Sequence, residues 1–152
     1  MNWVDRLLML FVPFFVIKNF AGDPYMVRYR LFKSRWFGIY LHHILRSDED
    51  PECHDHPWDF TSLILVSGYL EIQRFEADHT QYGERNMRIV RPWQIVRHKA
   101  EDAHRLILDK PAWTLVKVSG KKRLWGFYTT SGWMDYKAFL DRKYGKGGWV
   151  SE

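Results

Sequence analysis

Two histidines lie one residue apart at the head of an apolar run, in the stretch ECHDHPWDFTSLILVSGYLE. The i, i+2 spacing of His54 and His56 places both side chains on the same face of an extended strand. Imidazole is the commonest side-chain ligand for transition metals. A pair alone does not separate a metal site from acid–base or structural histidines, so a third ligand from another strand is needed.

His104 is the candidate for that third ligand, because it lies at the head of a second apolar stretch, DAHRLIL. His98 precedes it across the turn residues KAED. It could be a general base, a fourth ligand or a surface residue, and these alternatives stay open. His42 could also face the same space from a neighbouring strand.

The elements that must position these histidines are short strands. From Tyr25 onward, segments rich in β-forming residues alternate with turn residues at a spacing of about eight to twelve residues, which is typical of a sandwich or small barrel. Trp133–Gly145 predicts a helix, with Ser131 and Gly132 at its start. We expect residues 1–24 to pack on the domain or at an interface, 25–130 to form a barrel, and 131–152 to form a C-terminal helix and tail.

The composition limits the classes of protein. The chain has 152 residues, 17% of them aromatic, and a net charge of +5, so we expect one compact domain. Nucleic-acid signatures and long basic arms are missing from the sequence, so we interpret the charge as a solvated surface, with an anionic small ligand as the next interpretation. The single cysteine, Cys53, fits a reducing compartment, and we predict a cytoplasmic protein. Leu7–Ile17 is too short to span a membrane, and we do not expect membrane contact.

The histidine pattern resembles the cupin family of jelly-roll barrels. In the first cupin motif, a His-x-His pair is followed by a glutamate and a closing glycine; here His54 and His56 match the pair and Gly68 the glycine. His104 matches the histidine of the second motif. The resemblance covers Tyr25 to Thr130. More narrowly, "HDHPW…LILVSGYLE…DAHRL…GF" resembles a group of small bacterial and phage cupins.

The sequence departs from the cupin pattern at the glutamate ligand. This residue would fall at Phe60 or Thr61, neither of which can replace it. Asp59 comes early, with the wrong parity unless the strand bulges. Lys99 and Glu101 stand where the second motif has Pro and Gly. The resemblance therefore implies a three-histidine site, formed by His54, His56 and His104, for a divalent transition metal (Fe, Zn, Mn or Ni).

The resemblance implies a fold and a function class. The fold is all-β, a jelly-roll barrel with an N-terminal helical segment and a short C-terminal helix. The function is that of a metal-binding enzyme, of dioxygenase or isomerase type, acting on a small polar or anionic substrate in a homodimer. His98 is the candidate catalytic residue, and Tyr69, Arg97 and Arg105 are candidates for substrate binding.

Two other functions stay open. One is a metal-free sugar-nucleotide isomerase or epimerase, in which the histidines do acid–base work. The other is a non-catalytic module that binds a ligand or regulates a partner. The basic net charge of the chain suits a diphosphate ligand.

Overall fold

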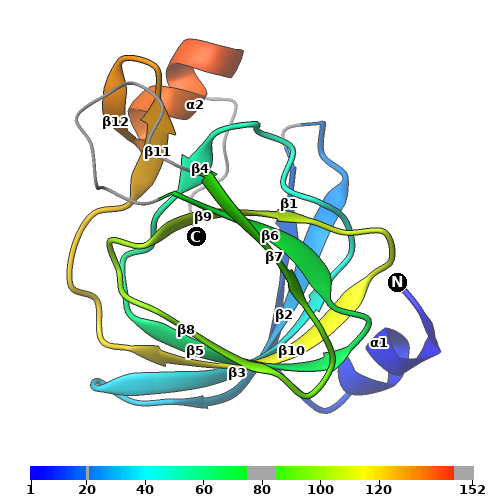
Figure 1. The fold of residues 1–152 in the computed structure, drawn as a ribbon. Helices are drawn as coiled ribbons and strands as arrows, with labels where there is room; N and C mark the ends of the chain where they lie inside the picture. The colour runs from blue at the N-terminus through cyan, green and yellow to red at the C-terminus, as the bar shows by residue number, and fades with distance from the viewer. Residues whose placement is uncertain (20, 75–84, 146–152) are drawn as a thin grey trace.

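Two six-stranded sheets face each other and enclose the interior of the protein (Figure 1). The computed structural model describes residues 1–19, 21–74 and 85–145 of the chain, and the predicted polar loop and C-terminal tail lie largely outside these ranges. The first sheet has the strand order β1-β2-β3-β10-β5-β8, and the second has the order β12-β11-β4-β9-β6-β7. All the pairings are antiparallel, and the fold is the expected jelly roll.

The strands of the first sheet come from both halves of the chain. They are β1 (Phe14–Lys18), β2 (Pro24–Lys33), β3 (Phe37–Ile44), β5 (Phe60–Val66), β8 (Ile95–His98) and β10 (Ala112–Ser119). Those of the second sheet are β4 (Cys53–His54), β6 (Tyr69–Arg74), β7 (Arg85–Val90), β9 (Ala103–Ile107), β11 (Gly126–Thr129) and β12 (Gly132–Asp135). From β3 to β11, successive strands lie in alternate sheets, except that β6 and β7 are neighbours in the second sheet, and this crossing brings distant histidines together.

The interior holds an apolar core beside the predicted histidines. From His104 to Ile107 in β9, the buried residues His104 and Leu106 alternate with less buried neighbours, which is the pattern of a strand with one face toward the interior. Strands β6, β8 and β10 show the same alternation. The buried core cluster consists of Met26, Ile44, Ile64, Tyr69, Val90, Val96, Leu106 and Ala112.

Gly68 makes the turn from β5 to β6, as the motif predicted. Its φ is +98°, and a Cβ at this position would lie 2.2 Å from the carbonyl oxygen of Val90. Any larger residue would therefore push β7 away from the turn. The closing glycine is needed to bring β6, with its inward side chains, directly after β5.

Asp5 holds the N-terminal segment on the outer surface of the first sheet. Helix α1 (Trp3–Leu8) begins with a capping box between Asn2 and Asp5. The carboxylate of Asp5 is fully buried and accepts hydrogen bonds from the Tyr29 hydroxyl (2.7 Å) and His43 Nδ1 (2.9 Å). Burial opposes ionisation, but these bonds and the one from Asn2 outweigh it, so the pKa of Asp5 lies below its ordinary value.

The apolar run Leu7–Ile17 does not form one element. Helix α1 ends at Leu8, and β1 begins at Phe14 and pairs with β2 at the edge of the sheet. Several large apolar side chains of this segment stay exposed, namely Leu7, Leu10, Phe11, Phe14 and Phe15. An interface role for this segment stays a prediction. Within the described ranges, the structure has no helix with the length and apolar character needed to cross a membrane.

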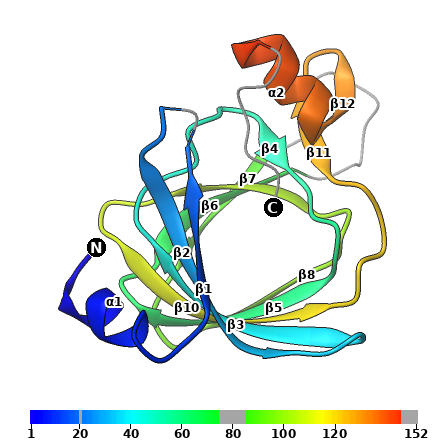
Figure 2. The same cartoon turned by 180° about the vertical axis from the view of Figure 1, so that it is seen from behind.

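The C-terminal helix starts later than the sequence predicted. Residues 132–135 form strand β12, and α2 extends over Tyr136–Tyr144. The helix begins there because the Asp135 side chain accepts hydrogen bonds from the backbone N–H groups of Lys137 and Ala138. Ser131 instead belongs to the turn between β11 and β12, and Gly132 begins β12. Helices α1 and α2 lie at opposite ends of the molecule, as both ribbon views show (Figures 1 and 2).

Replacing Asp5 with Asn should destabilise the fold by about 2–3 kcal/mol at neutral pH, because buried donors lose a charged acceptor. The pKa of Asp5 is lowered from its ordinary value of 3.8, so its contribution is complete above that pH and is lost as the pH falls through the folded-state pKa. Urea unfolding of native protein and D5N at about pH 7 and pH 3 measures this loss. The exposed acid Asp109 gives the control variant D109N. A difference between native and D5N that is equally large at both pH values would contradict the assignment.

Candidate metal centre

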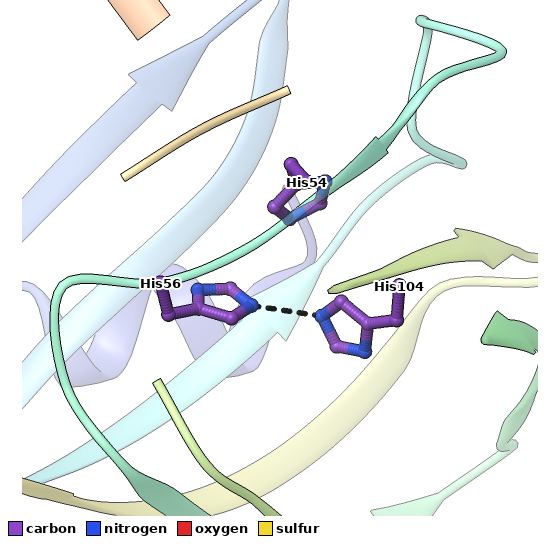
Figure 3. A group of neighbouring side chains, drawn as sticks. All are labelled: His54, His56 and His104. Atoms are coloured by element: carbon purple, nitrogen blue, oxygen red, sulfur yellow. Dashed lines mark hydrogen bonds between the residues drawn. The ribbon is translucent and has the colours of Figure 1, made fainter. Parts of the chain in front are cut away.

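The three predicted ligands converge in the interior. The side chains of His54, His56 and His104 point toward one another in Figure 3, and one ring nitrogen from each lies within 4.8 Å of the others. Their ring centroids are 5.0 to 5.3 Å apart. His54 and His104 are directly paired in β4 and β9, and His56 follows two residues after His54.

The distance between two of these nitrogens fits ligation of one ion. His56 Nε2 and His104 Nε2 are 2.9 Å apart. Two nitrogens that each lie about 2.1 Å from a common ion, at right angles, are separated by about 3.0 Å. Burial comes first among the causes that lower the pKa values of His54 and His56, and neighbouring histidines add to it. Both rings are therefore neutral near neutral pH, and a neutral imidazole has the lone pair that a metal needs.

Glu71 determines which nitrogen of His104 faces the site. Its carboxylate oxygen Oε1 lies 2.6 Å from His104 Nδ1. Burial alone would raise the pKa of Glu71, but hydrogen bonds from His104 and His98 outweigh it and hold the pKa far below the ordinary range. An ionised carboxylate only accepts hydrogen bonds, so Nδ1 carries the proton and Nε2 keeps its lone pair toward His56. Such carboxylate–histidine pairs are common behind metal ligands.

Two further groups hold Glu71. Its carboxylate is fully buried, and it accepts hydrogen bonds from His98 Nε2 (2.8 Å) and Arg88 Nε (2.5 Å). The Arg88 side chain is 42% exposed, so its guanidinium connects the buried carboxylate to the surface. His98 is therefore engaged by Glu71, and its catalytic role stays a prediction.

Glu71, His98 and His104 form a second group with metal-ligand chemistry. Their separations of 2.6 and 2.8 Å are those of hydrogen bonds between ring N–H groups and a carboxylate. Protons therefore satisfy this group. In the three-histidine group the lone pair of His104 Nε2 faces His56, so this group is the better fit to a divalent ion.

The site is accessible from the side of His54. The His54 side chain keeps 18% of its surface exposed, and its Nδ1 lies 3.9 Å from Asp48 Oδ2. Asp48 is held in turn by the Tyr25 hydroxyl and by the backbone N–H of Leu106. The negative charge of Asp48 opposes the effect of burial on the pKa of His54.

Phe60 stands where the motif's glutamate was expected. Its ring packs against His56, His98 and His104 at centroid distances of 4.7, 4.8 and 5.8 Å. Asp59 does not reach the site, because its carboxylate binds Lys122 Nζ (2.6 Å) and the backbone N–H of Ala100 (2.9 Å). The described residues near the triad therefore supply an aromatic ring, and no carboxylate, at this position.

The remaining predicted residues divide between the inward and the outward faces of the sheets. Tyr69 is part of the buried core, on the same face of β6 as Glu71, and burial together with the Glu71 charge raises its pKa. His42 also faces inward, beside Arg28. Arg97 is exposed between the buried residues Val96 and His98, and Arg105 alternates with inward-facing His104. Arg97 and Arg105 therefore point away from the triad, and we leave them out of the proposed site.

The sequence pattern did not identify Glu71, because the alternation of apolar residues along its strand predicts the wrong inward face. In YLEIQR, Leu70 and Ile72 look like the buried face and Glu71 like the solvent face. The structure buries Tyr69 and Glu71 and leaves Leu70 and Ile72 partly exposed. The position of Gly68 could have indicated the inward direction of Glu71, because the turn determines which residue of the following strand points inward.

Comparisons with known proteins support the fold. The sequence matches no protein-family model and no curated protein. A cupin-2 domain from Rhodospirillum rubrum is similar in structure, with a TM-score of 0.61 at 13% identity over 87% of this chain and 81% of that chain. Together with the two sheets, this similarity defines the class: the protein has a cupin jelly-roll fold.

Two enzymes share this fold. One is HEPD from Streptomyces albus, described with 2-hydroxyethylphosphonate and Fe(II) bound (TM-score 0.57, 11% identity, 74% of this chain and 25% of that chain). The other is the DMSP lyase DddQ from Ruegeria pomeroyi (TM-score 0.54, 17% identity, 74% of this chain and 58% of that chain). The chain thus spans about a quarter and somewhat over half of these enzymes, and at such identities the likeness shows the fold alone.

Replacing Glu71 with Gln should weaken binding of a divalent ion by about 10- to 100-fold, because His104 loses the charged partner that orients its ring. Calorimetric titration of the metal-free protein with Co(II) or Zn(II) measures this change. The exposed residue Glu101 gives the matched control E101Q, which should bind like the native protein. Equal affinities for native protein and E71Q, both folded, would refute the role of Glu71.

Proposed function

We propose that the chain is a metal-dependent cupin enzyme that acts on a small polar or anionic substrate. The proposed ligands of a divalent ion are His54, His56 and His104. The observation that carries the proposal is the pair of facing Nε2 atoms of His56 and His104, 2.9 Å apart, with Glu71 on the far nitrogen of His104. Three imidazoles suit iron, zinc, nickel or manganese, and iron comes first for testing because the similar HEPD structure contains Fe(II).

A divalent ion at this site would act as a Lewis acid on a substrate oxygen or support oxygen chemistry. The side chains around the site orient its histidine ligands and shield them. Glu71 holds His104 in one tautomer, and Phe60 covers the histidines with an apolar ring. Tyr69 places a hydroxyl on the inward face of β6, where a raised pKa keeps it protonated and able to donate to a substrate.

Elemental analysis tests the metal site. We expect about one equivalent of a transition metal in the native protein and none in the double variant H54A/H56A, since two of three ligands are removed. This variant keeps the Glu71 contacts to His98 and His104, so it should stay folded. The control H42Q removes a buried histidine outside the triad and should keep the metal. Protein that binds no metal after reconstitution with Fe(II), Mn(II), Ni(II) and Zn(II) would exclude the proposal.

A second function is favoured by the Glu71 contacts. A carboxylate that holds two histidines is the pairing that a metal-free isomerase or epimerase needs for proton transfer. This alternative is supported if the native protein lacks metal, binds a nucleotide sugar, and loses turnover of that sugar in H98Q. A ligand-binding module without turnover is the outcome if metal and ligand both bind and no reaction follows. A homodimer and a cytoplasmic location remain part of the proposal.

A further inference from the structure

Strands β11 and β12 and helix α2 form a small unit beside the proposed metal ligands, which we call the C-terminal unit. Both ribbon views show these elements together at one end of the molecule, next to β4 (Figures 1 and 2). Strand β11 joins the second sheet through the two residues of β4, where Cys53 pairs with Tyr128 and His54 pairs with Phe127. The strand to which the C-terminal unit is attached therefore carries a proposed metal ligand.

Asp55 lies between two of the proposed ligands in the sequence, and its side chain binds the C-terminal unit. The carboxylate is fully buried. Its Oδ1 accepts a hydrogen bond from the backbone N–H of Gly126 (2.7 Å), and its Oδ2 accepts one from Trp133 Nε1 (2.9 Å). The same Oδ2 lies 3.1 Å from Arg123 Nη2. One carboxylate thus connects β11, β12 and the segment before β11 to the loop that carries the ligands.

The backbone strengthens this connection at Gly126. The N–H of Asp55 donates to the carbonyl oxygen of Gly126 at 3.0 Å, so the two residues exchange hydrogen bonds. A Cβ on Gly126 would lie 2.0 Å from the carbonyl oxygen of Met134 in β12, so the close approach of these segments requires glycine. Asp55 is therefore fixed by main chain and side chain together, which limits the movement of His54 and His56 on either side of it.

Aromatic side chains of this region also stand beside the open side of the metal site. The ring centre of His54 lies 5.9 Å from that of Phe127 and 6.2 Å from that of Trp125, the residue before β11. Phe127 stacks on Phe139 of α2 at 4.1 Å, and Trp125 stacks on Tyr136 at 4.6 Å. The surroundings of the ligand that is open to solvent therefore depend on the position of the C-terminal unit.

We propose that Asp55 is a positioning residue that couples metal binding to the docking of the C-terminal unit. With the unit in place, Asp55 fixes the loop from which His54 and His56 bind the ion. The bound ion fixes the same loop and stabilises the docked unit in return, because coupling between two sites is reciprocal. Metal binding therefore also stabilises the aromatic wall beside His54. The inference rests on the proposed function, because it requires a metal at the three histidines.

Calorimetric titration of the metal-free protein with Co(II) tests the effect of Asp55 on the metal. In D55N the amide keeps one acceptor oxygen but turns its own N–H groups toward a present donor, so the affinity for Co(II) should fall about tenfold or more. The visible absorption spectrum of bound Co(II), which depends on ligand geometry, should change as well. The matched control is D59N, because the Asp59 carboxylate binds Lys122 and the backbone N–H of Ala100. D59N should bind Co(II) like the native protein.

Hydrogen exchange measures the coupling in the other direction. We expect the backbone amides of β11, β12 and α2 to exchange about tenfold more slowly in Co(II)-loaded than in metal-free native protein. This protection should exceed any change in β2 and β3, which report on the stability of the whole fold. In D55N the additional protection of the C-terminal unit should be lost, and in D59N it should equal that of the native protein.

Two results would overturn the inference while the metal site stands: native-like affinity of D55N for Co(II), or equal protection of the C-terminal unit by Co(II) in native protein and D55N. Native protein that binds no Co(II) would overturn the proposed function and the inference with it. If D55N does not fold, W133F replaces it, because it removes one donor to Asp55 from outside the ligand loop and keeps an aromatic ring. W133F should bind Co(II) more weakly and gain less protection on binding, and unchanged values would contradict the coupling.

Discussion

The hydrogen-bonded carboxylate of Glu71 is the group on which the arrangement of the interior depends. A buried charge is costly unless it is paired and hydrogen-bonded, and Glu71 is fully buried. It is tolerated because His104, His98 and Arg88 all contact it, from β9, β8 and β7. These contacts join strands of both sheets through one side chain. They also determine the proton on His104, so the same carboxylate serves folding and the chemistry of the site.

This site differs from the cupin motif that it resembles in two respects, the ring of Phe60 and the position of the Glu71 carboxylate. A carboxylate at the position of Phe60 would lie beside His56 and His104 and could neutralise part of the charge of an ion. Here an aromatic ring occupies that position, and the carboxylate lies on the far side of His104. The ion would therefore keep its full charge toward the substrate, because its ligands are neutral imidazoles.

The sequence was sufficient for the architecture and for the convergence of the three histidines, but not for the residues that support them. Strand spacing predicted a sandwich or small barrel, since turn residues and alternating patterns are local signals, and the resemblance to cupins implied the jelly roll. His54 and His56 were predicted from parity within one strand, although β4 ends at His54 and His56 lies just after it. Glu71 could not be found this way, because a charged residue in an alternating strand is expected to face solvent. Its inward direction depends on the pairing of β6 with β9, which joins residues distant in the chain.

Strand β3 carries two neighbouring histidines with separate roles on its two faces. His42 lies inside beside Arg28, and His43 lies outside, stacked on Trp113 and bonded to Asp5. Since side chains alternate along a strand, a shift of one residue would exchange them and leave Asp5 and Arg28 each without its present partner. Insertions or deletions of a single residue within β3 are therefore excluded. Changes in chain length on this side of the barrel can be absorbed in the loops at either end of the strand, and relatives of this chain should differ in length there.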